Sequence, residues 1–159
     1  MAILRNYLKA VLYPDNMVEG GMNVVKDQCY TIQHFAYECR HERNDAGFPY
    51  GTTTPSKLVF TIKLESPDNG KEFYQHMKQN ELFDYTFLFN ASFGSFGRLS
   101  SFDDAMTVKG YMIDVEEFYD GGNAVDGHTN QVLIKGTLLL SSIAYKSTDS
   151  DKILKITHF

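Results

Sequence analysis

The 159-residue sequence lacks tryptophan and contains only two cysteines, Cys29 and Cys39. On one continuous strand they would lie roughly 33 Å apart, since a strand advances ~3.3 Å per residue. A disulfide requires Cα atoms within ~7 Å of each other. We therefore expect two reduced cysteines, as is usual for a cytoplasmic protein.

Long apolar runs and an excess of positive charge are also missing. No stretch approaches the ~20 apolar residues that span a bilayer, so membrane insertion is not expected. Arg5, Asn6 and Lys9 interrupt the apolar N-terminal stretch, which is unlike a signal peptide. The expected location is the cytoplasm, unless a route without a signal peptide exports the protein. The net charge of −5 argues against nucleic-acid binding, which needs a basic patch.

The residues that usually carry catalysis or bind metals form no recognisable pattern. No histidine has another His or Cys at metal-ligand spacing. The five histidines are His34, His41, His76, His128 and His158. There is no nucleophile elbow and no phosphate-binding loop. Asp120, Asn123 and Asp126 depart from calcium-loop spacing, so a plain acidic turn is favoured. We predict that the protein is not an enzyme and has no catalytic residue, no cofactor and no metal ligand.

The abundant aromatics, 12 Phe and 10 Tyr, favour strands. The clearest strand is 57–65, because alternate residues point to opposite sides of a strand and apolar residues occupy one side. Those residues are Leu58, Phe60, Ile62 and Leu64. Further strands are expected at 3–13, 22–26, 30–40, 83–90, 107–115, 131–145 and 153–159. Both faces of 30–40 are partly apolar, which predicts a strand covered on both sides.

One amphipathic helix is expected at 67–79. Ser66 and Pro67 are favourable residues for a helix start, and Asp68 would lie at the positive end of the helix dipole. Phe73 and Met77 are four residues apart and therefore lie on one helical face. A single domain, 1–159, with one helix packed on a system of strands is the predicted organisation.

Residues 43–56 show neither helical nor strand periodicity and predict a long loop. Loops of this length in compact domains are usually functional or disordered. Phe48 and Tyr50 either fold back onto the domain or contact a partner through their apolar area. Two prolines, Pro49 and Pro55, would stiffen the loop and lower the entropy lost on docking.

The order of these features resembles the Hcp family (hemolysin-coregulated protein), the tube protein of type VI secretion systems, and in particular its Bacteroidetes branch. The resemblance covers about residues 29–146. It depends on 43–49, which reads Arg-Asn-Asp-Ala-Gly-Phe-Pro, on the strand that ends at Glu65-Ser66, on the short helix, and on 101–105, which reads Ser-Phe-Asp-Asp-Ala.

The resemblance implies a mainly-β fold: a flattened β-barrel of two sheets with one flanking α-helix, as in phage tail-tube proteins. It implies a homohexameric ring, and rings that stack into a hollow tube expelled by a contracting sheath. The implied partners are other copies of the chain, the sheath, spike and baseplate proteins of the apparatus, and effector proteins in the lumen.

The resemblance also assigns a role to residues 45–56 of this loop, which would contact the neighbouring ring. The residues predicted to make this inter-ring contact are Asp45, Gly47, Phe48, Pro49 and Tyr50. Two alternatives remain open from the residues alone. One is a monomeric β-barrel whose aromatics line a ligand pocket, and the other is a small barrel enzyme.

Overall fold

The computed structural model describes residues 10–15, 24–47, 49–64, 70–120, 131–147 and 153–157. The strands are β1 (Val11–Tyr13), β2 (Tyr30–Arg43), β3 (Pro49–Leu64), β4 (Phe83–Phe89), β5 (Ser92–Phe93), β6 (Leu99–Ser101), β7 (Asp104–Asp120), β8 (Gln131–Ser147) and β9 (Ile153–Thr157). The helical segments are α2 (Lys71–Gln79) and the short 3-10 turns η2 (Lys26–Gln28) and η3 (Ser95–Gly97).

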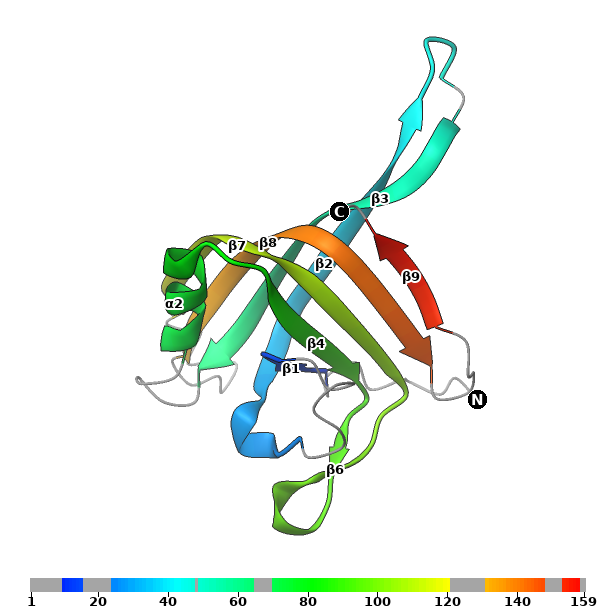
Figure 1. Cartoon of the computed structure of the whole chain (residues 1–159). Coiled ribbons are helices and arrows are strands. Elements are labelled where there is room, and N and C mark those ends of the chain that lie inside the picture. Colours follow the sequence, from blue (N-terminus) through cyan, green and yellow to red (C-terminus); the bar gives the residue numbers. More distant parts are fainter. Residues whose placement is uncertain are drawn as a thin grey trace.

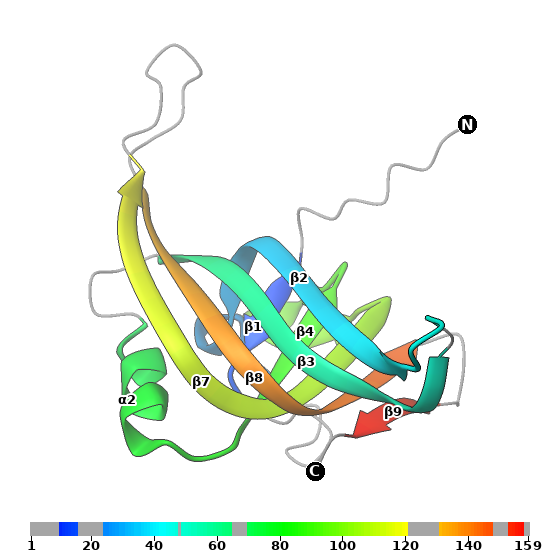
Figure 2. The same ribbon diagram turned by 90° about the horizontal axis from the view of Figure 1, so that it is seen from above.

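Most of the strands form one antiparallel sheet in the order β3-β2-β1-β4-β7-β8-β9, which closes through a further pairing of β3 with β8. The closed part is a six-stranded barrel, and β5 and β6 form a small second sheet. Figure 1 shows α2 beside the barrel, and Figure 2 shows the barrel strands wrapped around a common interior. The predicted fold class, a mainly-β barrel with one flanking helix, is confirmed.

The barrel is a packed core, because the inward side of each strand is apolar. On β3 the predicted alternation is confirmed: four alternate residues are buried and their neighbours are more exposed. The buried four are Leu58, Phe60, Ile62 and Leu64. On β4, Tyr85 and Phe87 enter the same core, whereas Leu88 on the other face joins a second, smaller cluster beneath β5 and β6. A strand covered on both sides is therefore found at β4.

The predicted helix is present but begins later than expected. Gly70 precedes α2 with φ 87° and ψ −6°, a left-handed conformation that no helix continues through. Ser66, Pro67 and Asp68 lie outside the described residues. The reason for glycine is also steric, because a Cβ at Gly70 would lie 2.4 Å from Cδ1 of Ile134.

Two strand predictions need correction. The segment 22–26 was expected to be a strand, but its described part makes a single bridge between Val25 and Arg98 and then enters η2. The chain turns there into β2, which requires a break in extended structure. On β2 itself, Phe35 packs inward while His34 and Ala36 on the outer side are exposed. Only the inner face of β2 is therefore covered in the single chain, because no described element lies over the outer face at these residues.

Other expectations hold at the level of the backbone. The strands at 83–90, 107–115, 131–145 and 153–159 correspond to β4, β7, β8 and β9. Of the strand expected at 3–13, the described part is β1, and 3–9 lie outside the described residues. The acidic turn after Asp120 also falls outside them.

Candidate assembly surfaces

The segment predicted to be a long loop is instead a β-hairpin that extends beyond the closed barrel. We call this hairpin, residues 39–55, the arm. Its two strands pair antiparallel, with Cys39 opposite Pro55, His41 opposite Thr53 and Arg43 opposite Pro49. Over the same length β3 does not pair with β8, because the pairing of these two strands begins only at Lys57. Figure 1 shows the arm projecting away from the barrel.

The arm is a hairpin because its threonines are β-branched and suit extended backbone. Register shifts beside Cys39 and between His41 and Arg43 interrupt regular pairing on either side of these threonines. Bulges of this kind are where a strand tolerates proline, which has no N–H to donate. The signal that could have found the hairpin is the run of three threonines, 52–54, beyond a turn-forming Asn-Asp-Ala-Gly sequence.

The tip of the arm is a tight, hydrogen-bonded turn. The Gly47 amide donates to the carbonyl of Asn44 at 2.9 Å, and the Ala46 amide donates to Oδ1 of Asn44 at 3.0 Å. Gly47 has φ 86°, a conformation that favours glycine. Asp45 is exposed between them. The backbone and the Asn44 side chain therefore both stabilise the turn at the tip.

The structure places four of the five predicted contact residues together at this end of the arm. Asp45 and Gly47 lie in the exposed turn, and Pro49 and Tyr50 begin β3. Phe48 lies outside the described residues. Their role in contacts between rings remains a prediction.

The aromatics of the barrel interior pack against one another instead of lining a pocket. The ring centroids of Phe35 and Phe87 are 4.7 Å apart, and those of Phe60 and Phe73 are 5.6 Å apart. Phe73 comes from α2 and is fully buried, so the helix contributes a side chain to the barrel core. Such an interior, filled by side chains as in other small barrels, does not favour the ligand-binding alternative.

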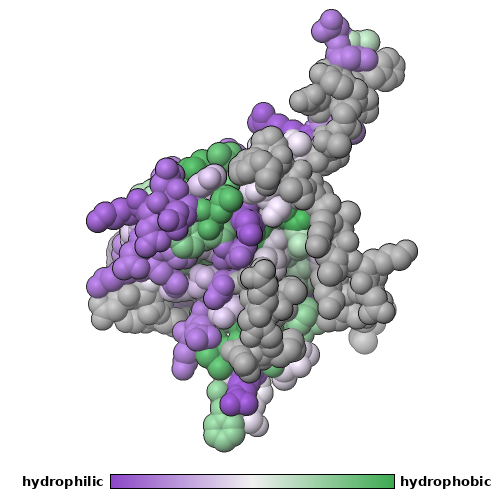
Figure 3. Space-filling view, viewed as in Figure 1, coloured by the Kyte–Doolittle hydropathy of each residue, from purple (hydrophilic) through white to green (hydrophobic). Residues whose placement is uncertain are grey.

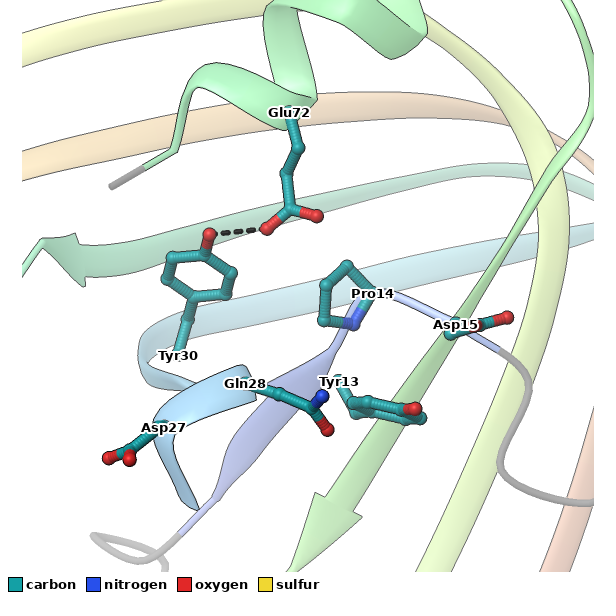
Figure 4. Close-up of a pocket in the computed structure, with 7 residues that line it drawn as sticks. All are labelled: Tyr13, Pro14, Asp15, Asp27, Gln28, Tyr30 and Glu72. Carbon is teal, nitrogen blue, oxygen red and sulfur yellow. Dashed lines mark hydrogen bonds between the residues drawn. The ribbon is translucent and has the colours of Figure 1, made fainter. Parts of the chain in front are cut away.

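A cleft of about 250 Å³ lies where β1, η2, β2 and α2 meet (Figure 4). Its lining residues are Tyr13, Pro14, Asp15, Asp27, Gln28, Tyr30 and Glu72. The Tyr30 hydroxyl donates a hydrogen bond to Glu72 and so ties β2 to α2. Burial, with that hydrogen bond and the charge of Glu72, raises the pKa of Tyr30.

The carboxylates of this cleft do not converge on one point. In Figure 4, Asp27 and Asp15 point away from each other, and Glu72 points toward Tyr30. Within the described ranges, no cluster of three or more His, Cys, Asp or Glu side chains is arranged to hold a metal ion. The cleft thus offers a structural link between strand and helix and no paired acid and base.

Both cysteines are free thiols, as expected from the sequence. Cys29, just before β2, donates a weak hydrogen bond to the carbonyl of Val25 at 3.5 Å, and burial raises its pKa to about 12. Cys39 lies at the base of the arm, and burial raises its pKa as well. In the described part of the chain, no helix combines the length and hydrophobicity required to cross a membrane.

A closed six-stranded barrel, a helix that contributes to its core and a projecting hairpin define the class of fold. No protein-family model matches the sequence, and no curated protein matches it. Solved structures do match. A crystal structure of an Hcp protein aligns with a TM-score of 0.66 at 10% identity, over 93% of this chain and 96% of the other.

The Hcp1 protein from E. coli aligns with a TM-score of 0.65 at 14% identity, over 94% of this chain and 98% of that one. Hcp1 from Flavobacterium johnsoniae aligns with a TM-score of 0.59 at 13% identity, over the same shares of the two chains. The chain therefore has the Hcp fold, as the order of its sequence motifs indicated.

Proposed function

We propose that this chain is the structural subunit of a type VI secretion tube. Six copies form a ring, and rings stack into a hollow tube that is expelled with effector proteins in its lumen. The proposal is supported by the Hcp fold, which extends over more than nine tenths of the chain. The single observation that carries it is the arm, a paired hairpin that extends outside the closed barrel and does not contribute to closing it.

The arm serves the contact between rings in this proposal. Its tip presents Asp45 and Gly47, followed along the chain by Phe48 and Tyr50. Burying large apolar side chains is worth ~1.5–3 kcal/mol each. Six such contacts around a ring add up to firm stacking even if each is only partly realised.

The contact between neighbours within a ring is supported by exposed apolar residues on the outer side of the barrel. Ile113 on β7 is 51% exposed and Leu139 on β8 is 44% exposed. Tyr111 is the cross-strand partner of Leu139, so these residues lie close together. A patch of this kind on a small domain favours contact with another protein surface.

The remaining parts of the proposal concern partners and location. The chain acts without catalysis and without a cofactor, and it contacts the sheath, spike and baseplate proteins of the apparatus. It is made in the cytoplasm and leaves through the type VI apparatus. It neither binds nucleic acid nor inserts into a membrane.

The test is the paired change Phe48→Ser and Tyr50→Ser. We expect single rings to persist while stacked rings disappear, because the arm lies outside the barrel. Size exclusion with light scattering measures the ring mass, and negative-stain electron microscopy counts tubes. The matched control is Met77→Ser with Leu82→Ser, which removes two partly exposed apolar side chains far along the chain from the arm. The control should stack normally.

Three outcomes would count against parts of this proposal. A wild-type protein with the mass of a monomer would favour a monomeric binding barrel or a small enzyme. Unchanged tubes in the paired variant would exclude the arm from stacking. A monomeric paired variant with normal thermal unfolding would assign the arm to the contact within a ring.

A further inference from the structure

The small β5–β6 hairpin presents an aromatic side chain to solvent. Phe96, in the η3 turn between the strands, is 96% exposed. Its backbone has φ 61° and ψ 21°, the left-handed conformation that a bulky residue rarely adopts. The other apolar residues of the hairpin face the second core cluster, where Leu99 is buried and Phe93 is half-buried. The position of Phe96 thus contributes nothing to that cluster.

Hydrophobic surface is visible at the tip of this hairpin, below the barrel in the view of Figure 3. Strained backbone that holds an exposed aromatic is typical of sites where function, rather than folding, selects the residue.

A cleft of about 540 Å³ lies at the base of the same hairpin. Most of its lining residues are small or apolar, and Lys26 is the one charged residue among them. The lining consists of Ala10, Val11, Lys26, Thr31, Ala91, Ser92, Phe93, Gly94 and Gly97. Lys26 belongs to this hairpin region, since a Cβ at Gly97 would lie 3.8 Å from the Cβ of Lys26, and the Leu99 amide donates to the carbonyl of Val24 at 2.8 Å.

The cleft and the arm lie at opposite ends of the molecule. Thr31, which lines the cleft, lies near the start of β2. The tip of the arm follows Arg43, at the other end of that strand. An extended strand of this length spans roughly 40 Å. Figure 1 shows the arm above the barrel and the β5–β6 hairpin below it. In a stack of copies that all face one way, the arm of one copy therefore approaches the cleft end of the next.

The two ends are also complementary in charge. The arm tip carries the exposed carboxylate of Asp45, and the cleft carries the exposed ammonium of Lys26. Opposite charges at such a contact fix its register.

We propose that the β5–β6 hairpin and its cleft, with Phe96 and Lys26, receive the arm tip of a second copy of this chain. The inference rests on the proposed stacking of rings and names its receiving surface. Asp45 of the arm pairs with Lys26 of the next copy, and Phe96 covers the docked tip.

The test is a charge exchange. Asp45→Lys and Lys26→Asp are made singly and together, and the fraction of protein in tubes is measured by sedimentation velocity and electron microscopy at low ionic strength. We expect each single variant to lower the tube fraction at least tenfold and the double variant to recover most of it. Lys78→Asp, on the exposed side of α2, is the matched control and should stack normally. Thermal unfolding verifies that every variant is folded.

Phe96→Ser supplies the second readout, and we expect it to keep rings intact while shortening or abolishing tubes. The inference is overturned if the double charge exchange is no better than the singles and Phe96→Ser stacks normally. The proposed function survives that result if Phe48→Ser with Tyr50→Ser still abolishes tubes, because the receiving surface then lies elsewhere. A wild-type chain that forms no rings would overturn both.

Discussion

Gly136 on β8 lies directly against the ring of Phe60 on β3. A Cβ atom at Gly136 would be 2.4 Å from Cζ of Phe60, closer than real contacts allow. The two residues are cross-strand partners at the pairing that closes the barrel. The ring occupies the space that a side chain at Gly136 would take. The same two residues therefore take part in the strand pairing that closes the barrel and in the packing of its interior.

We predict that Gly136→Ala destabilises the fold by about 1–3 kcal/mol, the usual cost of overpacking a core. Gly94→Ala is the matched control, because its Cβ would make an ordinary contact at 3.6 Å with Ser100. Urea unfolding of the two variants measures the difference. Equal stability of both variants would show that the Phe60 ring can move aside.

Phe73 anchors α2 to the barrel. It is fully buried, and its ring contacts those of Tyr30, Phe60 and Tyr85. We expect Phe73→Ala to cost about 3–5 kcal/mol, the range for removing a buried phenylalanine. Met77 is one turn later and 37% exposed, so Met77→Ala should cost far less. Denaturant unfolding followed by circular dichroism tests this, and similar losses in both variants would contradict it.

The ring of His76 is held between helix and barrel. Its Nδ1 is 2.6 Å from the hydroxyl of Tyr85, and its ring stacks on Phe83 with a centroid separation of 3.8 Å. Burial lowers the pKa of His76 in the folded state. The unfolded chain therefore binds a proton first as the pH falls, and the stability associated with neutral His76 is present above its unfolded pKa of ~6.5 and is lost below it.

We accordingly predict that the free energy of unfolding decreases between pH 7 and pH 5 and that part of this decrease is absent in His76→Gln. Urea titrations of both proteins at several pH values measure it. An identical pH dependence in the two proteins would mean that His76 titrates normally in the folded chain.

The two thiols should differ in reactivity toward iodoacetamide at pH 8. Burial raises the pKa of both thiols, and at Cys29 it raises the pKa to about 12, so the Cys29 thiolate is especially scarce. We expect Cys39 to be alkylated first and both thiols to react in denaturant without a reductant. Peptide mass spectrometry assigns the order. Failure to label either thiol in denaturant would indicate a disulfide.

Periodicity by itself determined most of the strands of this barrel. The alternation around Phe60 and Phe87 placed those side chains on the correct face, because a strand with one buried side must alternate. The order of motifs also indicated the fold of the solved Hcp structures, although identity with them is only 10–14%.

Tertiary structure decided the features that depend on contacts between distant residues, which a local sequence pattern does not contain. The arm read as a loop because Pro49, Pro55 and the glycines suppress strand signals, yet pairing with β2 makes it a hairpin. Gly70 precedes α2 in a left-handed conformation, and the end of the Ile134 side chain, 64 residues later, lies where a Cβ of residue 70 would be. The exposure of Phe96 and its place opposite the arm were likewise invisible in the sequence. Register and long-range contact fix such features, and both depend on residues far apart in the chain.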